Sequence, residues 1–171
     1  MRMKPKGRTS AAAPEAVAEF RLEDFLPYRL CVAAGHVARM FAQRCAMEFG
    51  LTIPEWRVLA TVGRFGTITP TAVGQSTAMD KVKVSRAAAA LVSRGLLRQV
   101  HDPQDGRARL LRLTRKGTSV HNGVVPLARE LEDLLAQGMS RTEWQALNRT
   151  LKRLNGHVQS IGDDAGTEAV D

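Results

Sequence analysis

Residues 80–117 read DKVKVSRAAAALVSRGLLRQVHDPQDGRARLLRLTRKG, and this stretch combines a short helix with a two-stranded hairpin. Asp80 is a residue type that caps helices, and apolar residues then recur at positions 84, 87, 88 and 91 before Gly95, a helix-ending residue. After Gly95 the spacing becomes that of extended chain, in two segments around the turn-rich residues 101–107. The pattern predicts a helix over 80–94 and then a hairpin with a charged tip.

Two more helices are expected just before residue 80. Thr52-Ile53-Pro54-Glu55 is a capping box with an early proline, and the helix that it opens ends before Gly66. Thr69-Pro70 starts a second, short helix. Three short helices followed by a hairpin are the layout of a winged helix-turn-helix, in which the second helix of the turn motif enters the major groove of DNA.

Longer helices are predicted on both sides of this segment. Apolar residues recur at helical spacing from Phe20 to Phe49, Thr114 caps a helix after the hairpin, and Ser140-Arg141-Thr142-Glu143 is a capping box for the last one. The last helix carries a seam that steps by four and three residues, which is typical of a helix packed against another helix. The seam consists of Leu147, Leu151, Leu154, Val158 and Ile161.

The partner of this seam is either another helix of the same chain or a second copy of the chain. We favour the second copy, because a helical core of about 60 residues divided between the two ends of the chain would be marginally stable alone. The predicted fold is mainly α with a small β-hairpin wing. Its expected parts are a disordered basic tail (1–18), a dimerisation helix (19–50), a winged helix-turn-helix domain (51–117), dimerisation helices (118–161) and a disordered acidic tail (162–171).

Length and composition exclude several classes of protein. The chain has 171 residues, the size of one ordinary domain, and 44% of them are hydrophobic. No apolar run approaches the roughly 20 residues that a membrane-spanning helix needs. The basic N-terminal stretch lacks the apolar core of a secretory signal, so we expect a cytoplasmic protein without a membrane partner.

The positive charge is concentrated in one segment. The chain has a formal net charge of +8, and residues 54–117 alone contain twelve Lys or Arg and four Asp or Glu. This segment coincides with the predicted winged domain. A basic surface over such a domain favours a nucleic-acid partner.

Catalytic and metal-binding patterns are missing from the sequence. It contains no glycine-rich phosphate loop, no nucleophile elbow and no His-Glu-x-x-His motif, so we expect neither an enzyme nor a cofactor. The four histidines show no ligand-like spacing. Cys31 and Cys45 lie fourteen positions apart, about 21 Å along one helix, which is too far for a disulfide, and we expect both thiols to be buried.

Several motifs in a fixed order resemble the MarR family of ligand-responsive transcriptional regulators. They are Ser85-Arg86 with Leu91, Gly95-Leu96-Leu97-Arg98, Asp105-Gly106-Arg107 and Leu113-Thr114-Arg115-Lys116-Gly117. The resemblance covers residues 22–160. It implies a homodimer whose termini interleave in a helical region and whose two winged domains bind a double-stranded operator with two-fold pseudosymmetry.

The helix and the resemblance together give the expected DNA contacts. Lysine and arginine can donate to guanine, serine to several base edges, and a valine can touch a thymine methyl. In the family the wing-tip arginine reaches the minor groove, and Arg107 matches it, with Asp105 positioning the wing through a basic partner such as Arg98. The predicted DNA-binding residues are Lys81, Val82, Lys83, Ser85, Arg86, Arg98, Asp105, Arg107 and Arg109.

The resemblance also implies a small anionic aromatic effector, bound between the dimerisation helices and the winged domain. Aromatic side chains could stack on its ring, and arginine or histidine could meet its carboxylate. The candidate ligand-binding residues are Tyr28, Arg29, His36, Met40, Trp56 and Arg57. Their wording is closest to that of regulators of aromatic-acid catabolism, some of which respond to hydroxycinnamoyl-CoA thioesters, so a CoA thioester is a candidate effector.

Two other functions stay open. Some family members sense oxidation through a cysteine near the start of the first helix, where Cys31 lies. An architectural DNA-binding protein would use the same basic surface without an effector and with little sequence preference.

Overall fold

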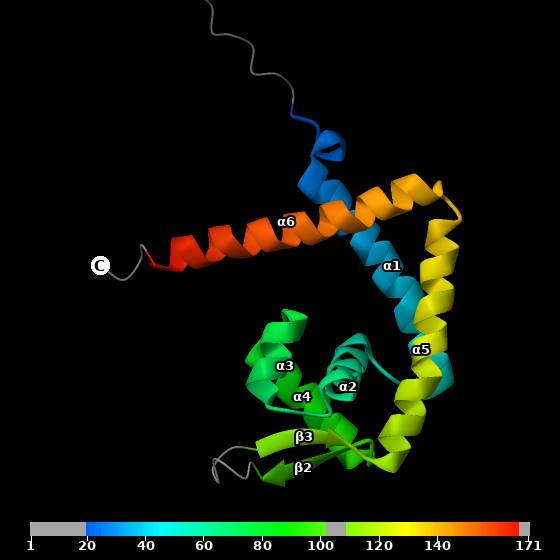
Figure 1. Cartoon of the computed structure of the whole chain (residues 1–171), viewed down its shortest axis with the longest axis vertical. Coiled ribbons are helices and arrows are strands. Elements are labelled where there is room, and N and C mark those ends of the chain that lie inside the picture. The colour runs from blue at the N-terminus through cyan, green and yellow to red at the C-terminus, as the bar shows by residue number, and fades with distance from the viewer. Residues whose placement is uncertain (1–19, 102–108, 168–171) are drawn as a thin grey trace, which may run out of the picture. The chain divides into compact units, whose positions relative to one another are not determined.

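The computed structural model describes residues 20–101 and 109–167, and its chain divides into two units, residues 1–37 and residues 38–171. Helices account for most of the described residues (Figure 1). The expected tails over residues 1–18 and 168–171 lie outside the described residues, and so does the predicted wing tip.

The first unit contains a short 3-10 helix, η1 (Leu22–Asp24), and the first part of the long helix α1 (Leu26–Phe49). Pro27 lies in the first turn of α1, where a missing N–H costs no hydrogen bond. The rings of Phe20 and Phe25 meet edge to face, with their centroids 5.6 Å apart.

The second unit begins with the last part of α1 and continues through three short helices. These are α2 (Ile53–Phe65), α3 (Pro70–Thr77) and α4 (Lys81–Ser93). The predicted capping box opens α2, since the Thr52 N–H donates to Glu55 Oε2 at 2.8 Å and the Glu55 N–H donates to Thr52 Oγ1 at 3.4 Å. The predicted order of short helices is therefore confirmed.

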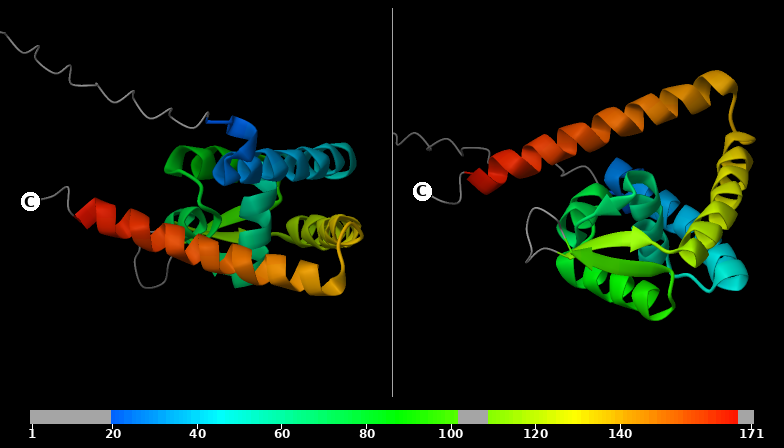
Figure 2. Two further views of the ribbon diagram at one scale, coloured as in Figure 1. Left: turned by 90° about the horizontal axis from the view of Figure 1, so that it is seen from above. Right: turned by 60° about the horizontal axis from the view of Figure 1, so that its bottom comes forward.

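A three-stranded antiparallel sheet follows α4 in the fold (Figure 2). Strands β2 (Leu97–His101) and β3 (Arg109–Leu113) form the predicted hairpin, with Leu97 opposite Leu113 and His101 opposite Arg109. A third strand, β1 (Thr67–Ile68), pairs with the other edge of β3. We did not predict β1, because two residues are too few to show an alternating pattern. Together with the three short helices, this sheet forms a winged helix-turn-helix.

The core of the second unit lies between the short helices and the sheet. Its fully buried side chains come from every one of these elements and from the helix that follows the wing, so α4 is held by a continuous apolar interior. Side chains with at most 2% exposure include Val58, Leu59, Val62, Val73, Val84, Leu91, Leu96, Leu97, Leu111 and Val124.

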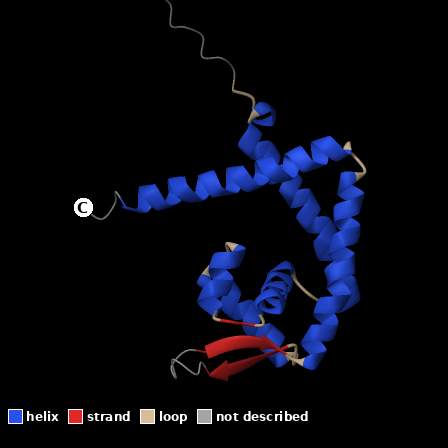
Figure 3. Cartoon of the chain, viewed as in Figure 1, coloured by secondary structure: helices blue, strands red, loops and turns tan. Residues whose placement is uncertain are grey.

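Two long helices complete the second unit (Figure 3). The first, α5 (Arg115–Ala136), begins at its predicted cap, because Thr114 Oγ1 accepts the N–H of Gly117 at 3.0 Å. The second, α6 (Arg141–Thr167), also begins at its predicted capping box, where the Ser140 N–H donates to Glu143 Oε2 at 2.8 Å.

The backbone of α6 continues beyond the expected boundary at residue 161. Residues 162–167, which we assigned to a tail without structure, extend the helix to Thr167. Adding a residue to an existing helix needs no new nucleus, so a helix can continue through two glycines. Among the helices of the described ranges, none combines the length and the apolar character needed to cross a membrane.

Candidate nucleic-acid interface

The turn between α3 and α4 sets the angle at which α4 is presented. Thr69 caps α3 through a 3.1 Å hydrogen bond to the N–H of Ala72, and α3 ends at Ala78, whose φ of 52° lies in the left-handed region. The next residue, Met79, is buried and donates its N–H to the carbonyl oxygen of Gly74 at 3.1 Å. A buried methionine after a left-handed residue anchors the turn in the core.

The helix α4 has one buried and one exposed face, as predicted. Its buried side chains are Val84, Ala87, Ala88 and Leu91. Its exposed face consists of Lys81, Val82, Lys83, Ser85, Arg86 and Ala89. Val82 is 57% exposed although it is apolar, and it shares this face with three cations. A surface of this composition matches the mixture of phosphates, polar edges and methyl groups in a major groove.

Asp80 caps the first turn of α4. Its Oδ1 accepts the N–H of Lys83 at 2.8 Å, and its Oδ2 lies 2.9 Å from the ammonium nitrogen of the same residue. The hydrogen bond from the Lys83 N–H, followed by the Lys83 ammonium, lowers the pKa of Asp80 below its usual value. Lys83 therefore serves the cap, whereas Lys81 and Arg86 have no such role.

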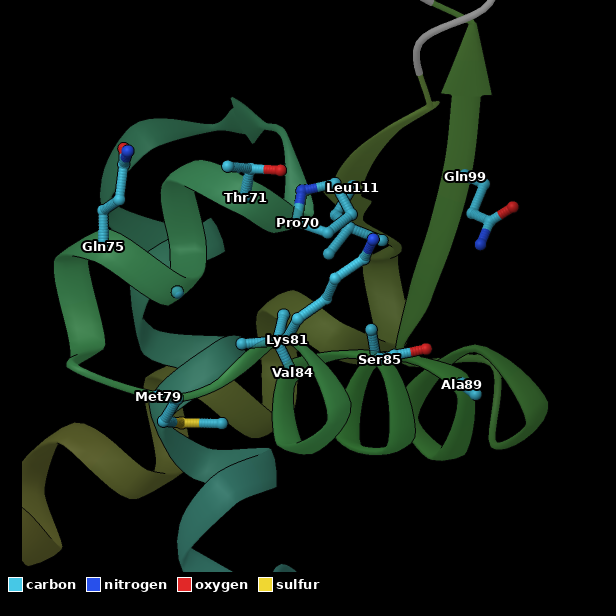
Figure 4. A pocket seen from close by; sticks show the side chains of 12 residues that line it. Pro70, Thr71, Gln75, Met79, Lys81, Val84, Ser85, Ala89, Gln99 and Leu111 are labelled. Atoms are coloured by element: carbon cyan, nitrogen blue, oxygen red, sulfur yellow. The ribbon is translucent and has the colours of Figure 1, made fainter. Parts of the chain in front are cut away.

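A hollow of about 430 Å³ lies between α3, the exposed face of α4 and the sheet. Figure 4 shows the side chain of Lys81 rising from the first turn of α4, with Ser85 and Ala89 further along the same face. Gln75 of α3 and Gln99 of β2 also line the hollow. The small residues at 85 and 89 leave this space open beside the surface that we predicted to meet DNA.

The wing carries several exposed cations on its strands. Arg98 of β2 stands opposite Arg112 of β3, and Arg109 Nη1 lies 3.2 Å from His101 Nε2 at the end of the hairpin. Arg98, Arg112 and Arg115 line a second hollow at the start of α5. Asp105 and Arg107, the predicted wing-tip residues, lie outside the described residues.

The predicted ligand-binding residues belong to both units. Tyr28, Arg29 and His36 are exposed on the first part of α1. In the second unit, Met40 and Arg57 are exposed and Trp56 is half-buried.

Trp56 is part of an aromatic cluster within the second unit. Its ring meets Phe41 edge to face at 5.7 Å and stacks on His121 at 6.3 Å. A Cβ at Gly63 would lie 2.5 Å from His121 Nε2, so the glycine makes room for the imidazole. Sequence reasoning missed His121 because it comes from α5, and only the helical glycine at 63 hinted at a bulky neighbour.

The two thiols differ in their surroundings. Cys45 is fully buried, and burial raises the pKa of its thiol. Cys31 is exposed, so the expectation of two buried thiols is wrong for this residue. The described part of the first unit holds only η1 and a single helix segment, which together have no interior. Among the described residues, no group of three His, Cys, Asp or Glu side chains could hold a metal ion.

Comparison with known proteins shows several similar chains. Residues 49–108 match the sequence profile described as the MarR family. The HTH-type transcriptional repressor IacR of Pseudomonas putida is 27% identical over 162 residues, which cover 90% of this chain and 96% of that protein.

Solved structures resemble the whole described fold. The crystal structure of a "probable transcriptional regulator" from Pseudomonas aeruginosa is 31% identical, with a TM-score of 0.71, and covers 78% of this chain and 99% of the other. BpsR of Bordetella bronchiseptica is 25% identical, with a TM-score of 0.74, and covers 80% of this chain and 96% of the other. The DNA binding of BpsR is regulated by 6-hydroxynicotinic acid.

Proposed function

Because the chain belongs to the MarR family of transcriptional regulators, we propose that it is a homodimeric repressor released from a pseudopalindromic operator by a small aromatic ligand. Its similarity to transcriptional regulators confirms the expectation that it is not an enzyme.

The exposed face of α4 carries the DNA-binding part of this proposal. That face presents Lys81, Val82, Ser85 and Arg86 to solvent, and it lies within the segment that holds twelve of the 25 cations of the chain. The first turns of α4 would read base edges in the major groove. Lys83, Arg98 and Arg109 would contribute charge near the phosphates, while Asp105 and Arg107 would place the wing in the minor groove.

An exposed apolar seam on α6 supports the homodimer. Leu151, Leu154, Val158 and Ile161 are each at least 39% exposed although they are large and apolar. Such a seam is stable in water only when another helix covers it. We propose that a second copy covers it, and that residues 19–50 and 118–161 form the dimerisation region of each chain.

The aromatic cluster around Trp56 supports an aromatic effector. Trp56 is half-buried, so part of its ring remains accessible, and Arg57 supplies an exposed cation next to it in the sequence. We propose that Trp56, with Met40 and Arg57 and with Tyr28, Arg29 and His36 of the first unit, binds a ring with a carboxylate. The relationship to BpsR favours an aromatic acid, and a CoA thioester of such an acid is the finer alternative.

A selection experiment tests the proposal. Purified protein is incubated with a random duplex library, and the bound sequences are recovered with and without 6-hydroxynicotinic acid, other aromatic acids and hydroxycinnamoyl-CoA thioesters. We expect one pseudopalindrome whose recovery a single ligand abolishes. Enrichment of A·T-rich DNA alone, without effect of any ligand, would contradict the proposal and indicate an architectural protein.

A further inference from the structure

The guanidinium of Arg94, at the end of α4, holds the end of α1. Its Nη2 donates to the carbonyl oxygen of Phe49 at 2.8 Å, and its Nη1 donates to the carbonyl oxygen of Gly50 at 2.9 Å. These carbonyls are at the negative end of the α1 helix dipole, and the planar fork of an arginine can meet both at once. One side chain therefore joins two helices that are more than forty residues apart in the sequence.

Glu55 fastens the same guanidinium to the start of α2. Its Oε2 lies 3.7 Å from Arg94 Nη1 and also accepts the N–H of Thr52. The Glu55 side chain is only 11% exposed, so its charge requires a nearby cation and hydrogen bonds. Gly50 adopts a φ of 61° beneath the guanidinium, which allows the chain to turn from α1 into α2 at this point.

The other side of the turn after α4 is held by α5. Lys116 Nζ donates to the carbonyl oxygen of Arg94 at 3.1 Å, and Thr114 Oγ1 donates to the carbonyl oxygen of Gly95 at 2.6 Å. Residues 94–96, which we call the Arg94 turn, thus lie between the α1–α2 junction and the start of α5.

We propose that Arg94 is a positioning residue that fixes the direction of α4 relative to α1 and α5, and so sets the half-site spacing that the dimer accepts. This inference rests on the proposed dimeric operator binding. The thirteen residues of α4 span about 20 Å, so a rotation of about 10° at the Arg94 turn would move the DNA-contacting first turn by about 3.5 Å. One base pair rises by about 3.4 Å, so a swing of this size matches one step of spacing.

The test compares operator affinities across half-site spacings. The selected operator is prepared with its native spacing and with one base pair added or removed, which also rotates one half-site by about 34°. Dissociation constants are measured for the wild type, Arg94→Gln, Arg94→Lys and Arg129→Gln. The control removes an exposed arginine from α5 that lies outside the Arg94 turn.

We expect a shifted spacing to weaken the wild type and Arg129→Gln by about tenfold or more, as a mismatched base pair does. For Arg94→Gln the ratio should fall below about threefold, because α4 can swing to meet either spacing. Arg94→Lys, which keeps the charge but meets one carbonyl at a time, should lie between and decides the case if the glutamine variant does not fold.

Arg94 variants that fold and retain the wild-type ratio would overturn the inference, whatever their absolute affinity. A loss of thermal stability alone does not change this ratio, since all spacings are measured on the same folded protein. A wild type without any spacing preference would contradict both this inference and the proposed dimeric function.

Discussion

Gly117, in the first turn of α5, lies directly against the carbonyl group of Leu96, which precedes the wing. A Cβ on Gly117 would lie 2.9 Å from the carbonyl carbon of Leu96 and would clash with its oxygen. Leu96 is 1% exposed, so neither backbone segment can move without disturbing the core. This close approach joins the wing to α5 and leaves room only for glycine.

Gly117→Ala should destabilise the protein by about 2–4 kcal/mol, because the added methyl group displaces buried backbone. Gly156→Ala is the matched control, since a Cβ there meets nothing within 4 Å and alanine favours a helix by up to about 1 kcal/mol. Urea unfolding curves measure both values. Equal stability of the two variants would show that the contact between Gly117 and Leu96 is not tight.

The cap at Asp80 predicts a pH dependence. The N–H and the ammonium of Lys83 hold the pKa of Asp80 below its usual value, so the carboxylate stabilises the folded state above about pH 4, the pKa of an unperturbed aspartate. This contribution is lost as the pH falls through the lowered pKa of the folded state. Asp80→Ala should therefore have a lower melting temperature than the wild type at pH 7, and the difference should shrink on acidification.

Asp80→Asn is the control for this measurement, because asparagine caps a helix about as well as aspartate but does not titrate. It should melt close to the wild type at pH 7. A difference between Asp80→Ala and the wild type that stays constant from pH 7 to pH 3 would contradict a role for the ionised carboxylate.

Leu154→Glu should abolish the dimer. Leu154 lies on the exposed seam of α6, and in a two-fold dimer each such residue is lost twice, at about 1.5–3 kcal/mol for each buried leucine. Sedimentation should show wild-type protein at twice the 18.7 kDa of one chain and the variant at the mass of a single chain. Arg153→Gln changes a neighbouring residue outside the seam and should stay dimeric. A dimeric Leu154→Glu would contradict the proposed interface.

Arg107→Ala should weaken operator binding by about 10- to 100-fold and lower the slope of log affinity against log salt by about one, because one phosphate-proximal cation is lost. The dimer should remain folded, as seen by circular dichroism and sedimentation. Arg129→Ala, on the exposed surface of α5, should change neither quantity. Unchanged affinity of Arg107→Ala at matched salt would remove the wing from the DNA contact.

Local signals in the sequence predicted most of the fold. Asp80, Thr114 and the capping boxes at Thr52 and Ser140 all act within three residues, so each helix start could be found from its own residues. The exposed face of α4 could also be predicted, because its apolar stripe recurs at helical spacing.

Contacts between distant segments could not be predicted in this way. Arg94 meets Phe49 across 45 positions, and His121 meets Trp56 from another helix, so neither pairing leaves a periodic trace. The exposure of Cys31 depends on what surrounds the first part of α1, and residue type alone led to the wrong expectation. The predicted roles of individual DNA-contacting and ligand-contacting side chains remain proposals.

The most direct test of the central claim is the ratio of two dissociation constants, one for the selected operator and one for a duplex of the same composition with its sequence shuffled, at one salt concentration. A sequence-specific regulator should bind the operator at least about 10³-fold more tightly. Dissociation constants within about tenfold of each other would contradict sequence-specific regulation, because phosphate contacts alone would then account for the binding.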